Sequence, residues 1–189
     1  MDLNLGFRYV IIRSLKQVIE GCQLIDEEFK VLKAMSEATN KMDLNAFSRK
    51  VGFSPAETVE QIQQLAKEGF LQKVGGGFGI TNKGKAALKA LSPVPEGMSF
   101  QFYYGLNQPA QLSATTLKEF YVVIRQISIE SIEFHLYRRD FENWIKDAVK
   151  DPELAHEIEH FREEELKNDE LKKAILKKLD ASYNIRDLI

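Results

Sequence analysis

Two histidines four residues apart are the first candidates for chemistry in this sequence. The run His156-Glu157-Ile158-Glu159-His160 fits the His-Glu-x-x-His pattern, in which two imidazoles on one helix face bind zinc and the glutamate is a general base. The surrounding segment is rich in solvated charge, and Glu163 to Glu165 follow too closely to supply the usual separate third ligand. We therefore expect no metal site, and a metal-dependent hydrolase is only a remote alternative.

The third histidine, His135, precedes Asp140 by a few residues, so the pair could form a general base with an orienting carboxylate. No nucleophile, glycine-rich phosphate loop or second carboxylate at a useful spacing accompanies them. The simpler interpretation is that His135 bonds a backbone group or Asp140 and locks a junction between helices. We expect a binding protein rather than an enzyme, with no catalytic residue and no cofactor.

The composition is that of an ordinary globular protein, with 189 residues, 44% hydrophobic and 29% charged. No apolar run approaches the ~20 residues that span a bilayer, and the first residues lack the basic start and cleavage site of a signal peptide. The single cysteine, Cys22, excludes an internal disulfide and a cysteine-rich zinc site. We expect an intracellular, cytoplasmic protein without membrane contact.

Charge is distributed unevenly along the chain, although the net charge is only −2. Residues 1–92 carry 13 Lys and Arg against 10 Asp and Glu, which gives +3, whereas residues 93–189 carry 13 against 18, which gives −5. A mildly basic first half is compatible with a nucleic-acid partner, but +3 is small for a dedicated DNA-binding domain.

Helical periodicity with clear start and stop signals marks the first half. Residues 1–22 contain an amphipathic helix at 6–21, which we expect to pack on other parts of the protein or on a partner chain. Asp26 is expected to cap the next helix, which ends near Asn40, and Asp43 begins a short helix that Gly52 closes. The third helix starts at Ser54-Pro55-Ala56-Glu57, which has the pattern of a capping box with proline at the first helical position.

Two short strands and a last helix complete this half. Phe70 to Val74 and Phe78 to Thr81 predict a hairpin across Gly75-Gly76-Gly77, and a helix starts at Thr81. The run Leu65 to Leu71, the glycine-rich turn and the run Ile80 to Leu88 together resemble the archaeal and bacterial winged helix-turn-helix regulators. The resemblance implies a winged helix over residues 23–92, with the hairpin as its wing, and it implies DNA binding.

The second half begins with a linker and extended segment at 93–114. Within it, Ser99 to Gly105 is the best strand candidate, and Asn107 to Ser113, which is polar and contains Pro109, is interpreted as a loop. Residues 115–189 are expected to form a helical domain. The run Glu133 to Ile145 and the following Asp151 to Ala155 resemble a small, mainly archaeal helical domain family of unknown function, with the pattern F-x-H…D-F-x-x-W.

A DNA-binding mode follows from the winged helix. Its third helix, Ser54 to Glu68, would enter the major groove, where glutamine can bond adenine and threonine can contact a thymine methyl group. Lysines of the wing and its flanks would neutralise phosphates. Glu57 and Glu60 oppose this mode because they would face phosphates. The residues that we expect to contact DNA are Arg49, Lys50, Ser54, Thr58, Gln61, Gln64, Lys67, Lys73, Lys83 and Lys85.

The sequence therefore predicts a mainly α protein with a small β wing that acts as a DNA-binding transcriptional regulator. Its expected partners are double-stranded DNA and a second copy of the chain, since two half-sites multiply the affinity of one weakly basic module. Residues 6–21 and the C-terminal helices are the expected dimer surface, with Leu171, Ile175 and Leu179 as a candidate seam. The alternative is an adaptor whose winged helix contacts a protein and never DNA.

Overall fold

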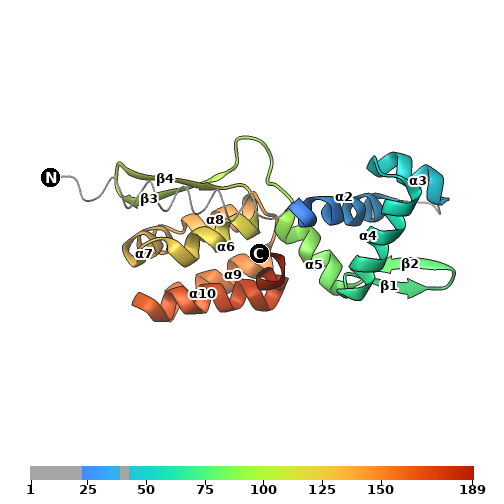
Figure 1. Ribbon diagram of the computed structural model, residues 1–189. Helices are drawn as coiled ribbons and strands as arrows, with labels where there is room; N and C mark the ends of the chain where they lie inside the picture. The colour runs from blue at the N-terminus through green and yellow to red at the C-terminus, as the bar shows by residue number, and fades with distance from the viewer. Residues whose placement is uncertain (1–22, 39–42) are drawn as a thin grey trace.

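Helices dominate the structure, and two small antiparallel hairpins lie among them (Figure 1), which confirms the predicted mainly α fold class. The computed structural model describes residues 23–38 and 43–189. The predicted helix at 6–21 lies outside the described residues. The described residues form an N-terminal unit, 23–38 and 43–92, and a C-terminal unit, 99–189, which lie side by side (Figure 1). In the part of the chain that is described, no helix combines the length and apolar character needed to cross a bilayer.

The N-terminal unit has the order of elements that the sequence predicts. Asp43 accepts the Ala46 N–H and so caps α3, which ends at Gly52 with a φ of +79°. One expectation is wrong: α2 is already helical at Gln23, so Asp26 lies inside this helix and does not cap it. The elements are α2 (Gln23–Glu37), α3 (Leu44–Val51), α4 (Pro55–Lys67), β1 (Leu71–Val74), β2 (Gly77–Ile80) and α5 (Asn82–Leu91).

The corner between the β1–β2 hairpin and α5 depends on a threonine and a glycine. The Thr81 hydroxyl donates to the Gly69 carbonyl at 2.7 Å and accepts the Gly84 N–H at 3.0 Å, so it caps α5 and ties it to the end of α4. A Cβ on Gly84 would lie 2.3 Å from the Phe70 carbonyl oxygen. Glycine is therefore required where α5 passes close to the backbone that enters β1.

The C-terminal unit is an antiparallel hairpin packed on helices. Figure 1 shows the hairpin along one side of α6 and α7, with α9 and α10 on the opposite side. A short 3-10 helix, η1, ends the chain. The elements are β3 (Phe100–Gly105), β4 (Gln108–Ala114), α6 (Leu117–Gln126), α7 (Ile129–Tyr137), α8 (Asp140–Asp147), α9 (Pro152–Glu163), α10 (Asn168–Tyr183) and η1 (Ile185–Leu188).

The prediction of a loop at 107–113 is wrong, because most of this segment is strand β4. Pro109 is tolerated since it lies opposite Tyr103 between two register shifts, where the ladder of hydrogen bonds is already interrupted. The inward positions of β4 include the buried Ala110 and Ala114. Small side chains at these positions conceal the alternation that identifies a strand. The segment 100–114 therefore forms a hairpin that packs on α6 and α7.

The apolar side of α10 packs inside its own chain. Leu171, Ile175 and Leu179 are all 0% exposed, and α10 contacts α6, α7 and α9. These three residues are therefore unavailable as a dimer seam, contrary to the sequence prediction. These three residues recur every four positions because one side of α10 packs against the other helices of the C-terminal unit.

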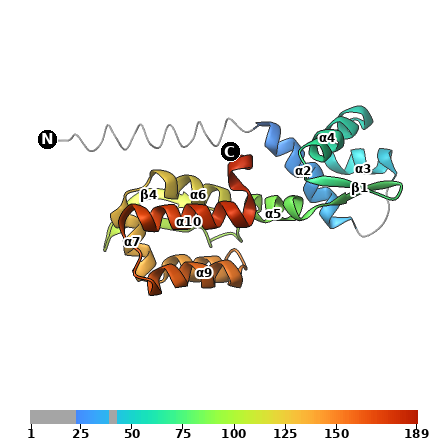
Figure 2. The same cartoon turned by 90° about the horizontal axis from the view of Figure 1, so that it is seen from below.

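The two units are held together through α5 and η1. Helix α5 packs against α6, α10 and η1, and Figure 2 shows the C-terminal end of the chain beside α5. The Lys89 ammonium on α5 lies 2.8 Å from an Asp151 carboxylate oxygen. Asp151 is 7% exposed and also accepts the Leu154 N–H at the start of α9. One carboxylate thus caps a helix of one unit and pairs with a cation of the other.

Candidate nucleic-acid interface

Helix α4 is the predicted recognition helix, and its first turn is fixed by a reciprocal capping box. The Ser54 hydroxyl accepts the Glu57 N–H at 3.2 Å, and the Glu57 carboxylate accepts the Ser54 N–H at 2.8 Å. The hydrogen bond from the Ser54 backbone lowers the pKa of Glu57, and the bond to the Ser54 side chain adds to it. This carboxylate is therefore charged and directed at the start of α4. Ser54 itself acts as a cap.

Thr58 does not face outward as expected. It is 0% exposed, and its hydroxyl donates to the Ser54 carbonyl at 2.9 Å. That internal bond satisfies the polar group, so threonine is tolerated at a core position of the helix. A contact between Thr58 and a thymine methyl group is excluded in this conformation.

The two candidate glutamines are half-buried and already engaged. Gln61 donates to a Glu27 carboxylate oxygen of α2 at 3.5 Å, and Gln64 donates to Glu68 one turn further along. Base reading by either amide would require it to leave its partner. The charged and amide side chains that α4 and its C-cap do expose are Glu57, Glu60, Gln63, Lys67 and Glu68, three anions against one cation.

The remaining predicted contacts are cationic. Lys50 on α3 lies 3.7 Å from Glu37, in an exposed pair that contributes little. Four of the other five cations are exposed, and none of these four has an ion-pair or hydrogen-bond partner for its side chain among residues 23–38 and 43–189. They come from α3, α4, β1 and α5 in turn: Arg49, Lys67, Lys73 and Lys85.

Lys83 is half-buried and already bonded to other groups of the protein. Its ammonium lies 2.8 Å from an Asp187 carboxylate oxygen and donates to the Glu68 carbonyl at 3.1 Å. The same ammonium lies 4.7 Å from the centre of the Phe70 ring. Asp187 is near the end of the chain, so spacing within the winged-helix region gives no sign of this contact.

His135 and Trp144, from the second resemblance, hold the β3–β4 hairpin in place. The Tyr103 N–H donates to His135 Nε2 at 2.8 Å, and His135 Nδ1 lies 2.8 Å from Asp140. Trp144 Nε1 donates to the Met98 carbonyl at 2.8 Å. Both imidazole nitrogens are therefore occupied, and the interpretation of His135 as a locking residue is confirmed. The pKa of His135 is lowered by burial, which outweighs the nearby Asp140 carboxylate.

The His-Glu-x-x-His segment lies on the surface of α9. His156 and His160 pair with Glu159 and with Glu163 and Glu164, while the Glu157 carboxylate lies 2.9 Å from Lys178. Across the described residues, no three side chains of the metal-binding types lie close enough together to hold an ion. Among the described residues, the His-Glu-x-x-His segment is therefore not part of a three-ligand metal site.

No family model, curated protein or solved structure matches this chain significantly. The assignment of a function to the N-terminal unit therefore depends on its own surface.

Proposed function

We propose that the N-terminal unit is a winged helix that binds double-stranded DNA, and that the protein is a transcriptional regulator. The observation that carries this proposal is a set of exposed cations, Arg49, Lys67, Lys73 and Lys85, whose side chains have no partner among the described residues. Free ammonium and guanidinium groups gain most from phosphates because no internal ion pair must be broken first.

The proposed contact is made mainly with the DNA backbone. Lys73 lies on the wing strand β1 and Lys85 on α5 just beyond the wing, so both are available to phosphates beside a groove. The centre of α4 contributes little base reading, since its exposed face is acidic and its half-buried glutamines are bonded internally. Affinity that depends on phosphates is strongly sensitive to salt and only weakly selective for sequence.

Fluorescence anisotropy with a labelled duplex of mixed sequence, at ~50 mM salt, tests the proposal. We expect the double variant Lys73→Gln, Lys85→Gln to bind several-fold more weakly. Lys146→Gln, which removes an exposed lysine of the C-terminal unit, is the matched control and should bind as the unchanged protein does. Equal affinities for all three proteins would rule out the proposed surface.

A protein-interaction adaptor is the second candidate, and the acidic face of α4 favours it. Glu57, Glu60 and Glu68 present three carboxylates that suit a basic protein partner better than a nucleic acid. Glu60→Lys separates the two functions. Removing this repulsion should strengthen binding to DNA if DNA is the partner, whereas no binding by either form of the protein would favour the adaptor.

We also propose that the protein acts as a homodimer, because a single weakly basic winged helix makes few phosphate contacts. The core positions of α10 are excluded as the interface, as described above. Light scattering coupled to size-exclusion chromatography should give twice the 21.7 kDa mass of the chain. A mass of one chain at micromolar concentration would contradict the dimer and leave the proposed DNA surface untouched.

A further inference from the structure

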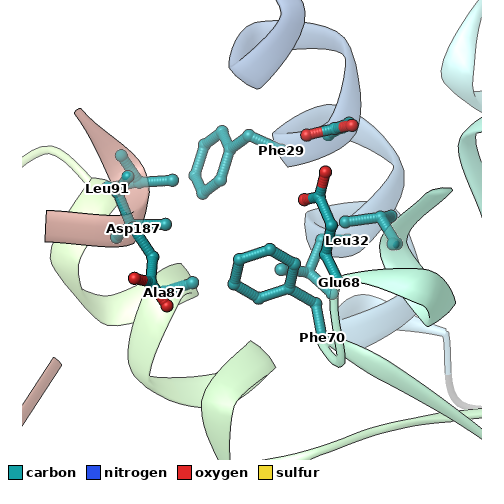
Figure 3. Close-up of a pocket in the computed structure, with 10 residues that line it drawn as sticks. Phe29, Leu32, Glu68, Phe70, Ala87, Leu91 and Asp187 are labelled. Carbon is teal, nitrogen blue, oxygen red and sulfur yellow. The ribbon is translucent and has the colours of Figure 1, made fainter. Parts of the chain in front are cut away.

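A small cavity lies where the N-terminal unit meets the end of the chain (Figure 3). Its volume is about 40 Å³, and it is partly open to solvent. The walls are contributed by α2, the corner between α4 and β1, α5 and η1. Most of the lining is apolar and includes Phe29, Leu32, Phe70, Leu91 and Leu188.

The cavity is also lined by a buried carboxylate. Glu28 on α2 is only 7% exposed, and its Oε1 atom has no hydrogen-bond partner among the described residues. Burial raises the pKa of Glu28, and the negative charge of Glu68 raises it further. A buried acceptor without a donor costs folding free energy, so the structure holds this carboxylate in an unfavourable state that a donor would relieve.

The charges around the cavity are unbalanced toward the negative. Glu68 and Asp187 line it together with Glu28, and Figure 3 shows the Glu68 carboxylate reaching toward α2. Lys83 does not line the cavity, but it contacts residues that do: its ammonium pairs with Asp187. Its position over the Phe70 ring shows that this aromatic surface accepts a cation. Among the described residues, no cation pairs with Glu28 or Glu68, although the Gln64 amide donates to Glu68.

We propose that this cavity binds a small organic amine, with its ammonium group between Glu28 and Glu68 and its apolar part against Phe29 and Phe70. An ammonium group offers three N–H donors, enough to satisfy both carboxylates. The small volume suits an ammonium group and its first carbon, so the remainder of the amine extends through the open side.

A metal ion fits this place less well than an amine. Magnesium and calcium take six or more oxygen ligands. The described residues provide no group of three side chains that could hold a metal ion, and Asp187 already pairs with Lys83. The apolar walls would also hinder the water molecules that complete the coordination of such ions. A ligand with one cationic end and one apolar end can pair with the carboxylates and pack against the apolar walls of the cavity.

The test measures the melting temperature and the heat of binding of the full chain with benzylamine hydrochloride. Benzyl alcohol has the same ring without the charge, and sodium chloride matches the ionic strength. We expect a saturable rise in melting temperature with the amine alone. Glu68→Gln should weaken amine binding by about tenfold or more, the effect of losing one charged partner, whereas Glu60→Gln on the exposed face of α4 should not.

Several results would overturn the inference. Equal stabilisation by benzyl alcohol would identify an apolar cavity without selectivity for charge. A larger rise with calcium or magnesium chloride would identify a metal site. An unchanged affinity in Glu68→Gln would place the amine elsewhere. Glu28→Gln should abolish binding, and if that variant fails to fold, Glu68→Gln decides, since Glu68 lies at an exposed position. None of these results depends on binding to DNA.

Discussion

Some polar side chains of the N-terminal unit bond to other groups of the protein, and others have no such partner among the described residues. Thr58 and Lys83 are bonded: one bonds the backbone of its own helix and the other reaches Asp187 in the C-terminal unit. Lys73 and Lys85 have no partner in the part of the chain that the structure describes. The composition of a segment therefore overstates the charge that it can offer a partner. For DNA binding, the free cations are the ones that matter.

At the residue scale, Gly84 is the position least tolerant of a small change. Gly84→Ala would place a methyl group 2.3 Å from the Phe70 carbonyl oxygen, so the α5 helix would have to move. We expect the free energy of unfolding to fall by about 2 kcal/mol or more. Gly76→Ala is the matched control, since a Cβ there meets nothing within 4 Å and its φ is not positive. Urea denaturation of both variants measures the difference, and equal stability would refute the close approach.

His135 makes stability depend on pH. Its Nε2 atom accepts the Tyr103 N–H only when the imidazole is neutral, and burial holds its pKa below the ordinary value of about 6.5. The unfolded chain therefore takes up the proton more readily than the folded one. We expect this contribution to be complete above about pH 6.5 and to be lost as the pH falls through the lowered pKa.

His135→Gln tests this linkage. The variant should be less stable at pH 7, and the gap between it and the unchanged protein should narrow as the pH falls to 5. His156→Gln, at an exposed position of α9, should keep the slope of the unchanged protein. A gap that stays constant from pH 7 to pH 5 would show that titration of His135 is not linked to folding.

At the scale of elements, the capping box of α4 is expected to contribute measurably to stability. Ser54→Ala removes the hydroxyl that accepts the Glu57 N–H, and the cost should be about 1 kcal/mol. Ser36→Ala is a suitable comparison, because Ser36 lies inside α2 and bonds only a carbonyl of its own helix. That change should be nearly neutral in thermal denaturation. Equal losses would mean that the box adds nothing beyond helix propensity.

The elements that could be predicted from the sequence are those with local signals. The helix starts at Asp43, Ser54 and Thr81 are set by side chains that bond their own first turn, so nearby residues suffice to find them. Strand β4 has no such signal. Its pairing partner is in the preceding strand, and its inward positions hold alanines, so only the packing on α6 reveals it.

The candidate site, like the elements, could be predicted only where the signal is local. Exposure of Arg49, Lys67, Lys73 and Lys85 follows from the position of each on its helix or strand. The ion pair between Lys83 and Asp187 joins residues that are distant in sequence and meet only in the folded chain. The cavity beside Glu28 was missed for the same reason, since its walls come from both ends of the described chain.

At the scale of the whole molecule, the packing of α5 on the C-terminal unit should make unfolding a single transition. Trp144 is the only tryptophan of the chain and lies in the C-terminal unit, so its fluorescence reports on that unit. Circular dichroism reports on all helices. The fluorescence and circular-dichroism signals should change at the same denaturant concentration. The variant Lys89→Gln breaks the ion pair with Asp151. In this variant the two transitions should separate, or both should move to a lower denaturant concentration. Separate transitions in the unchanged protein would contradict coupling of the units.

The salt dependence of DNA affinity tests the proposed DNA surface most directly. The four cations of the proposed surface predict a slope of about −3.6 for the logarithm of the binding constant against the logarithm of salt concentration, for each bound chain. Replacing Lys73 and Lys85 by glutamine should reduce its magnitude by about 1.8, and Lys146→Gln should leave it unchanged. No binding at low salt, or the same slope in all three proteins, would contradict DNA binding through this surface.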